Sequence, residues 1–257
     1  DPNGIGKATG ALTVPLKTQI ANHLQRFTKF RDSDLILIWS GNNDVFIQFG
    51  AFAAAATQIK TDAATGVISS DEAGRRLFQA QSAAQEEMKK AALELSGYVK
   101  DEILAKGGRY VSVFNLPDSA SSPFGASLPA DARGVLSTLV DTFNLWLRDG
   151  LTGVAVQIVD QNTKAKDITA NPGSYGLTNN SVPACDGPIS GALTGGRVTD
   201  GSSLFCNTTT GAPFDALRTG ASVTTWQFAD SVHPTTGGHR IISDYVLQQL
   251  RAFGWIK

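Results

Sequence analysis

The sequence of 257 residues has no cluster of basic residues, no long apolar run and only two cysteines. Its 22 Lys and Arg residues are balanced by 23 Asp and Glu residues, so the basic surface that nucleic-acid binding requires is missing. The longest apolar stretches, 35–39 and 51–56, are much shorter than the roughly 20 residues that cross a bilayer. The first residues lack the basic start and apolar run of a signal peptide. We therefore expect no nucleic-acid partner and no membrane-spanning helix.

The two cysteines, Cys185 and Cys206, lie in a segment rich in Gly, Asn, Thr and Pro, which has few other means of ordering its backbone. We expect a structural disulfide between them; the alternative is two unrelated buried thiols. On the chain-entropy model, a bridge across a loop of this size stabilises the fold by roughly 3 kcal/mol. Disulfides persist in oxidising compartments, so we expect an exported protein, secreted or held at the cell surface.

Alternating apolar patterns predict an α/β fold with a parallel sheet. Short apolar runs predict three strands, at 34–41, 109–117 and 154–159. The first run is apolar almost throughout, as in a strand that is buried on both faces. Apolar residues at helical spacing predict four helices, over 14–30, 71–106, 130–151 and 241–253. This order implies right-handed crossovers and helices on both sides of the sheet. The Gly-, Asn- and Thr-rich residues 161–225 predict a long surface excursion with little regular structure.

A polar block follows the first predicted strand, at the strand end where ligands of open α/β sheets bind. Asn43, in a turn at this end, can donate its amide NH₂ to a developing oxyanion, a contribution often worth roughly 3 kcal/mol. The structural alternative is that this asparagine bonds its own backbone, as is common in turns. For Asp44 we expect a structural role, in which the carboxylate bonds backbone amides of the turn.

A second polar block precedes the last predicted helix. Asp230 comes three residues before His233, a spacing that can place the carboxylate beside imidazole Nδ1 and leave Nε2 free as a general base. The structural alternative is that Asp230 caps a turn and that His233 is a surface residue. The other two histidines, His23 and His239, lie in or near predicted helices, and we interpret them as solvated and structural residues.

Taken together, the two blocks resemble those of the SGNH, or GDSL, hydrolases. Gly41-Asn42-Asn43-Asp44 is similar to the family's G-x-N-D block, and Asp230-Ser231-Val232-His233 is similar to its D-x-x-H block. The family has a bacterial secreted branch that contains phospholipases, lecithinase-like haemolysins and autotransporter esterases. Three further segments are similar to this branch, and they lie at 115–118, 171–177 and 228–235. The resemblance extends over nearly the whole chain.

The resemblance implies a fold, a reaction and roles for these residues. The fold is a flavodoxin-like three-layer α/β/α sandwich, and the reaction is hydrolysis of an acyl ester through a covalent acyl-serine, without a metal or another cofactor. Asn43 is then an oxyanion donor, His233 the general base and acid, and Asp230 the carboxylate that orients the imidazole. Gly41 and Asp44 are expected to support the first block structurally. The sequence has no metal-ligand spacing, which agrees with this chemistry.

The sequence departs from the family pattern in one respect, because it contains no Gly-Asp-Ser block with the nucleophilic serine. Its first predicted strand already leads into the oxyanion block. Residues 1–257 are therefore expected to supply about three of five strands and to form the larger, C-terminal part of a single hydrolase domain. The serines that are present are poorly placed to be the nucleophile. Ser40 precedes the oxyanion block, Ser119 follows a different strand, and Ser202 and Ser203 lie in the polar excursion. We expect the nucleophile on an upstream segment, either a separate chain after cleavage or residues outside this numbering.

Apolar residues after Asn43 indicate a substrate class. Phe46 and Phe49 can line an apolar groove for an acyl chain, with Asn42 as a further substrate contact, although ordinary helix packing explains the phenylalanines equally well. Such a groove favours a secreted bacterial lipase, esterase or phospholipase with peripheral membrane contact, which can also transfer acyl groups to alcohols. The alternatives are a carbohydrate acetyl esterase on the same fold and a non-catalytic binding or passenger domain.

Overall fold

The computed structural model describes residues 14–257, and the chain divides into two compact units. The first unit contains the chain as far as Leu116 together with Gly134–Gln161, and the second contains Pro117–Arg133 and Asn162–Lys257. The sheet and most of the long helices belong to the first unit, whereas the long loops and the disulfide belong to the second.

The sheet is parallel and consists, in spatial order, of β1 (Leu35–Ile38), β2 (Tyr110–Phe114) and β3 (Gln157–Val159). Leu35 pairs with Tyr110, and Ser112 pairs with Gln157. Sequential parallel strands are joined by right-handed crossovers, so the helices that connect β1 to β2 and β2 to β3 lie on the same face of the sheet. The predicted α/β fold with a parallel sheet is confirmed.

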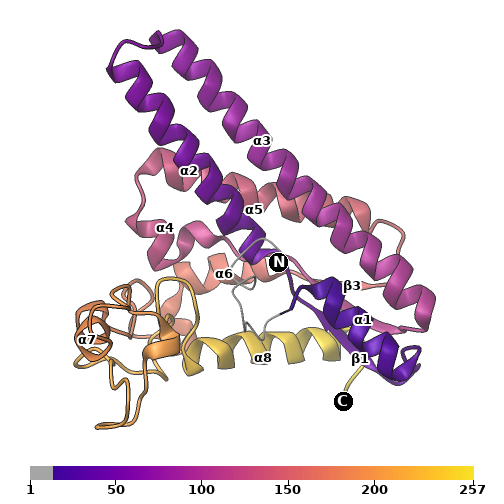
Figure 1. Cartoon of the computed structure of the whole chain (residues 1–257). Coiled ribbons are helices and arrows are strands. Elements are labelled where there is room, and N and C mark those ends of the chain that lie inside the picture. The colour runs from indigo at the N-terminus through magenta and orange to yellow at the C-terminus, as the bar shows by residue number, and fades with distance from the viewer. Residues whose placement is uncertain (1–13) are drawn as a thin grey trace. The chain divides into compact units, whose positions relative to one another are not determined.

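Four long helices accompany the sheet, namely α1 (Leu16–Phe27), α2 (Asn42–Ala64), α3 (Ser70–Gly97) and α5 (Ala130–Gly150). Figure 1 shows α2 and α3 as a long antiparallel pair joined by a short turn. The side chain of Ser69 caps α3 by accepting the N–H of Glu72 at 3.2 Å. After α3 the chain continues through a π-helical turn, Tyr98–Ile103, and a 3₁₀ turn, Leu104–Lys106. The helices predicted over 14–30, 71–106 and 130–151 are therefore present.

The long helix α2 was not predicted, because its apolar and small residues surround the helix instead of forming one stripe. Its N-terminus is set by Gly41, whose φ of +119° is a backbone conformation that residues with a Cβ rarely adopt. Residues 42–44 are consequently the first turn of a helix, and the prediction that they form a turn after β1 is wrong in this respect.

The core of the first unit contains buried side chains of α3, α5 and β2. The predicted apolar stripes of the two helices are buried, with Met88, Ala92, Val99, Leu136, Leu139, Val140 and Leu147 inaccessible to solvent. The two helices touch directly, because the ammonium of Lys89 lies 4.4 Å from the ring centroid of Trp146. Near the end of α5, Gly150 leaves room for Ser96, whose Oγ would lie 2.6 Å from a Cβ at that position.

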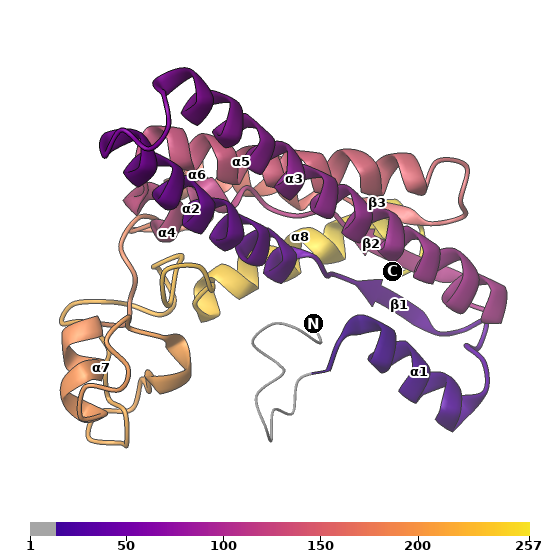
Figure 2. The same ribbon diagram turned by 45° about the horizontal axis from the view of Figure 1, so that its top comes forward.

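The strand β1 differs from its prediction, because it is not buried on both faces. Ile38 is buried, but Leu35, Leu37 and Trp39, which share one face of the strand, remain 39–48% exposed. β1 is also one of the two outer strands of the sheet, as Figure 2 shows. A continuous apolar run reveals that both faces can be buried, but it does not reveal whether a neighbouring element covers them.

The second unit contains three short helices and one longer helix. The short ones are α4 (Pro123–Ser127), α6 (Gln161–Ala170, whose first residue belongs to the first unit) and α7 (Gly187–Leu193), and the longer one is α8 (Thr236–Ala252). Three 3₁₀ turns, Ser119–Ser121, Pro172–Tyr175 and Ser203–Phe205, interrupt its loops. The segment 161–225 is therefore less irregular than predicted, since it includes α6 and α7. These two helices bury few apolar side chains, Ile168 being the main one, and so leave almost no periodic signal in the sequence.

The last helix, α8, begins five residues before its predicted start. Thr235 caps it by accepting the N–H of Gly238 at 3.1 Å. Gly237 and Gly238 lie in the first turn, where a Cβ would meet the carbonyl oxygens of Thr224 and Gln227 at 2.2 and 2.5 Å. Glycine has a low helix propensity, so the sequence pattern does not predict this first turn of α8. The close packing of the backbone requires glycine at both positions.

The predicted disulfide between Cys185 and Cys206 is present, and it closes a loop between residues 21 apart in the sequence. Cys185 is buried, and its backbone N–H donates to the carbonyl oxygen of Ala229 at 2.8 Å. Over residues 14–257 no helix combines the length and apolar character needed to cross a membrane.

Candidate active site

Asp230 and His233 are in contact in the loop that precedes α8. Nδ1 of His233 lies 2.9 Å from each carboxylate oxygen of Asp230. The Asp230 side chain is only 7% exposed, whereas that of His233 is 68% exposed. Nε2 of His233 makes no hydrogen bond with any residue from 14 to 257. The pair thus combines a buried carboxylate with an imidazole whose outer nitrogen is available.

Hydrogen bonds of the local backbone bring Asp230 and His233 together within a segment of four residues. The Oδ1 atom of Asp230 accepts the N–H groups of Val232 at 3.0 Å and of His233 at 2.7 Å, which closes a tight turn. The N–H of Ala229 donates to the carbonyl oxygen of His233 at 2.8 Å, and Phe228 forms an antiparallel bridge with Pro234. The turn folds the imidazole back over the carboxylate of its own segment.

The protonation state of Asp230 follows from its contacts. Burial alone would raise the pKa of this carboxyl group, but hydrogen bonds from Ser203, His233 and Val232 outweigh burial and lower the pKa from 3.8 to about 2. Asp230 is therefore ionised at neutral pH. An ionised carboxylate at Nδ1 favours the tautomer in which Nδ1 carries the proton and Nε2 accepts one.

The low pKa of Asp230 predicts a specific loss of stability in acid. A carboxyl group whose pKa is lower in the folded protein stabilises the fold above its unfolded-state pKa and loses this contribution as pH falls through the folded value. Between about pH 4 and pH 2, the free energy of unfolding should decrease by about 2 kcal/mol more in the natural protein than in Asp230→Asn. Urea unfolding at a series of pH values measures this, and parallel curves for the two proteins would contradict it.

The first polar block lies in the first unit, at the end of β1. Asn42, Asn43 and Asp44 open α2, with Asn43 exposed and Asn42 and Asp44 half-buried. Burial raises the pKa of Asp44, although its carboxylate accepts a hydrogen bond from its own backbone N–H. A carboxylate in the first turn also interacts favourably with the positive end of the helix dipole. That Asn43 serves the same site as His233 remains a prediction, as do the roles of Asn42 and Asp44.

Gly41 stands in contact with the ring of Phe143 from α5. A Cβ at position 41 would lie 2.5 Å from Cζ and 2.8 Å from Cε2 of this ring. Position 41 therefore requires glycine for two reasons: its φ is positive, and the Phe143 ring leaves no space for a Cβ. Farther along α2, Phe49 is buried like a core residue, while Phe46 remains half-buried. Of the two phenylalanines expected to line a groove, Phe46 is the more accessible.

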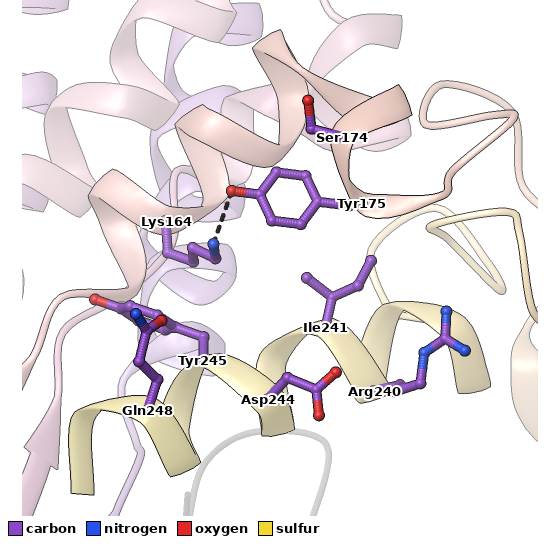
Figure 3. Close-up of a pocket in the computed structure, with 8 residues that line it drawn as sticks. All are labelled: Lys164, Ser174, Tyr175, Arg240, Ile241, Asp244, Tyr245 and Gln248. Carbon is purple, nitrogen blue, oxygen red and sulfur yellow. Dashed lines mark hydrogen bonds between the residues drawn. The ribbon is translucent and has the colours of Figure 1, made fainter. Parts of the chain in front are cut away.

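The second unit also contains a cavity of about 480 Å³ that includes none of the site residues expected from the sequence. It is lined by Lys164, Ser174, Tyr175, Arg240, Ile241, Asp244, Tyr245 and Gln248 (Figure 3). The ammonium of Lys164 donates to the Tyr175 hydroxyl at 2.7 Å, and this hydroxyl donates to Asp167. Tyr175 also packs against the small core formed by Ile168, Leu177 and Ile241. These contacts tie α6 and the 3₁₀ turn to α8.

One residue in contact with the Asp230–His233 pair was not expected. Ser203, in the 3₁₀ turn before Cys206, donates its backbone N–H to Oδ2 of Asp230 at 3.0 Å. Ser203 and Asp230 are distant in the sequence, and the donor is a backbone group that every residue except proline carries. No sequence pattern marks such a contact, although the Cys185–Cys206 disulfide indicates that the turn is held in place.

The comparison with known families agrees with this geometry. Residues 3–246 match the GDSL-like lipase/acylhydrolase family. The chain belongs to this family. The expected membership of the GDSL hydrolases is thereby confirmed at the level of the family, as is the α/β fold expected for it.

The names of two relatives state an activity. Esterase EstA of Pseudomonas aeruginosa and esterase EstA of Pseudomonas putida are each 32% identical to the chain over 150 residues. These residues make up 56% of this chain and 20% of each relative, so the chain spans about a fifth of the length of the curated relatives it matches.

Proposed function

We propose that the chain is part of a serine ester hydrolase that cleaves acyl esters through an acyl-serine intermediate. The observation that carries this proposal is the contact between an ionised, buried Asp230 and Nδ1 of His233, which leaves Nε2 as a base. Membership of the GDSL-like family and the esterase names of two relatives support the same reaction class.

In the proposed reaction His233 transfers the protons. Nε2 takes the proton of the serine hydroxyl as Oγ attacks the ester carbonyl carbon, and the imidazolium is stabilised by Asp230, which stays ionised. The amide of Asn43 donates to the oxyanion of the tetrahedral intermediate. Collapse breaks the bond to the alcohol, which leaves with the proton from Nε2. A water molecule, deprotonated by Nε2, then attacks the acyl-serine and releases the acid and the serine hydroxyl.

We place the nucleophilic serine on a segment upstream of residue 1. Two observations support this: the sequence lacks a Gly-Asp-Ser block, and β1 is an outer strand with an exposed apolar face. The unpaired edge of an outer strand is suited to pair with a further strand, and the exposed side chains of Leu35, Leu37 and Trp39 offer apolar surface that further residues can cover. The upstream segment would supply that strand together with the serine.

A fluorophosphonate, which reacts with activated serines, tests the proposal. The full-length protein is treated, and denaturing intact-mass and peptide mass spectrometry locate the label. We expect one label on a serine upstream of residue 1 and none when His233→Ala is treated in the same way. A label within residues 1–257 would refute the placement of the nucleophile. Absence of any label with the upstream segment present would favour a non-catalytic binding domain.

For the substrate we propose an ester with an apolar acyl chain, as in a secreted or cell-surface lipase, esterase or phospholipase. The disulfide supports an oxidising location. The half-buried ring of Phe46, three residues after Asn43, supports an acyl contact. Phe46→Ser should lower kcat/KM for an octanoate ester about tenfold more than for an acetate ester, because only the long chain reaches the ring.

The matched control is Phe78→Ser on α3, where the ring is 72% exposed. This variant should lower turnover of neither ester. Equal losses for octanoate and acetate in Phe46→Ser would contradict the acyl contact and leave the acetyl esterase alternative standing.

A further inference from the structure

The carboxylate of Asp230 is held from two directions. Its Oδ1 atom accepts the N–H groups of Val232 and His233, both within its own turn. Its Oδ2 atom accepts the N–H of Ser203 at 3.0 Å, and the Ser203 hydroxyl bonds the same carboxylate. Among residues 14–257, Ser203 is the one residue outside the turn that hydrogen-bonds Asp230. The orientation of the carboxylate therefore depends on a second loop.

The disulfide connects that second loop to the segment that carries Asp230. Ser203 opens the 3₁₀ turn Ser203–Phe205, and Cys206 follows it directly. Cys206 is bonded to Cys185, whose N–H donates to the carbonyl oxygen of Ala229 at 2.8 Å. The N–H of Ala184 likewise donates to the carbonyl oxygen of Phe228 at 2.9 Å. A closed ring of covalent and hydrogen bonds thus runs from Asp230 through the disulfide and back to Asp230.

We propose that Ser203 is a positioning residue for the Asp230–His233 pair and that the Cys185–Cys206 disulfide holds it in place. This inference rests on the proposed function of the pair. With Oδ1 and Oδ2 both bonded to backbone N–H groups, the carboxylate cannot rotate, and the imidazole it contacts keeps one orientation. Without the Ser203 donor, Oδ2 keeps only Nδ1, and the pair can turn as a unit. Loss of a donor to the ionised form also raises the pKa of a carboxyl group.

Proline at position 203 removes both the N–H and the hydroxyl, so the comparison with Ser203→Ala isolates the effect of the N–H. Proline has no N–H, and it is well accepted in the first turn of a helical segment, which is the position of Ser203. The preceding residue, Ser202, has φ −49° and ψ 131°, an extended conformation that a following proline requires. Ser203→Ala removes the hydroxyl and keeps the N–H. Leu204→Ala is the matched control in the same turn, because Leu204 is 85% exposed.

Two measurements on the full-length protein test the inference, namely the kinetics of ester hydrolysis and the pKa of Asp230. The pKa is followed by NMR of ¹³C-labelled aspartate carboxyl groups. In Ser203→Pro we expect the pKa of Asp230 to rise from about 2 toward 3.8. We expect kcat to fall between about tenfold and a hundredfold, with KM little changed. Ser203→Ala should change the pKa of Asp230 and kcat less than Ser203→Pro does. Leu204→Ala should change neither the pKa nor kcat.

The disulfide is tested with Cys185→Ser combined with Cys206→Ser. We expect the same two changes, a higher pKa of Asp230 and a lower kcat, at temperatures where circular dichroism shows the variant folded. An unchanged pKa of Asp230 in Ser203→Pro would overturn the inference, whatever the kinetics. A raised pKa with unchanged kcat would overturn the positioning role. Failure of the proposed function is distinguishable, because the natural protein itself would then hydrolyse no ester.

Discussion

Replacing His233 by alanine should lower kcat/KM for ester hydrolysis at least about a hundredfold while leaving the fold intact, because the general base is lost. The imidazole is 68% exposed, so its removal creates no cavity in the core. Its contact with Asp230 is the one hydrogen-bonding contact that the ring makes within the described chain. Initial rates with acetate and octanoate esters measure the loss, which should be the same for both substrates.

His239→Ala is the matched control for this prediction. His239 is also exposed, lies in the first turn of α8 and makes no hydrogen bond with Asp230. We expect this variant to keep full activity. Comparable activity of His233→Ala and the natural protein would show that the Asp230–His233 pair is structural. In that case another group of the protein would act as the general base.

Replacing Gly41 by alanine should lower the free energy of unfolding by about 3 kcal/mol or more, because two penalties add. A Cβ at φ +119° is strained, and the same Cβ would lie 2.5 Å from Cζ of Phe143. The ring belongs to the buried core of α5 and cannot move without disturbing its neighbours. Urea unfolding followed by circular dichroism measures the effect. Activity should fall as well, since Gly41 sets the start of the helix that carries Asn43.

The control lies in the same helix. Gly50 has open space around its Cα and an ordinary helical backbone, so Gly50→Ala should stabilise the protein by about 1 kcal/mol. A second variant separates the two penalties at position 41. If the ring contributes, Gly41→Ala combined with Phe143→Ala should lose less stability than the sum of the single losses. Strict additivity would leave backbone strain as the whole cause.

The sequence predicts those parts of the fold that depend on local or periodic signals. The stripes of α3 and α5 carry long, regular apolar spacings, and both helices are found where these spacings place them. The Asp230–His233 contact depends on a spacing of three residues within one turn, so it too is predictable. The disulfide follows from the presence of only two cysteines in one loop-rich segment.

Features that depend on packing between distant segments were missed. The glycines at the start of α8 are helical because carbonyl groups of Thr224 and Gln227 lie against them, which no propensity records. The exposure of Leu37 depends on what lies over β1, and an apolar run carries no such information. The Ser203 contact with Asp230 uses a backbone donor and joins residues far apart in the chain.

The pairing of β1 with β2 also has a consequence for how the first unit folds. The chain between Leu35 and Tyr110 contains the whole α2–α3 pair. A long loop must therefore close before the pairing of the two strands stabilises the unit. The two helices, in contrast, are joined by a short turn, and contacts close in sequence form faster than distant ones. We therefore expect α2 and α3 to associate first and to bring the two strands together. During refolding, the amides of β1 and β2 would then be the last in this unit to gain protection from hydrogen exchange.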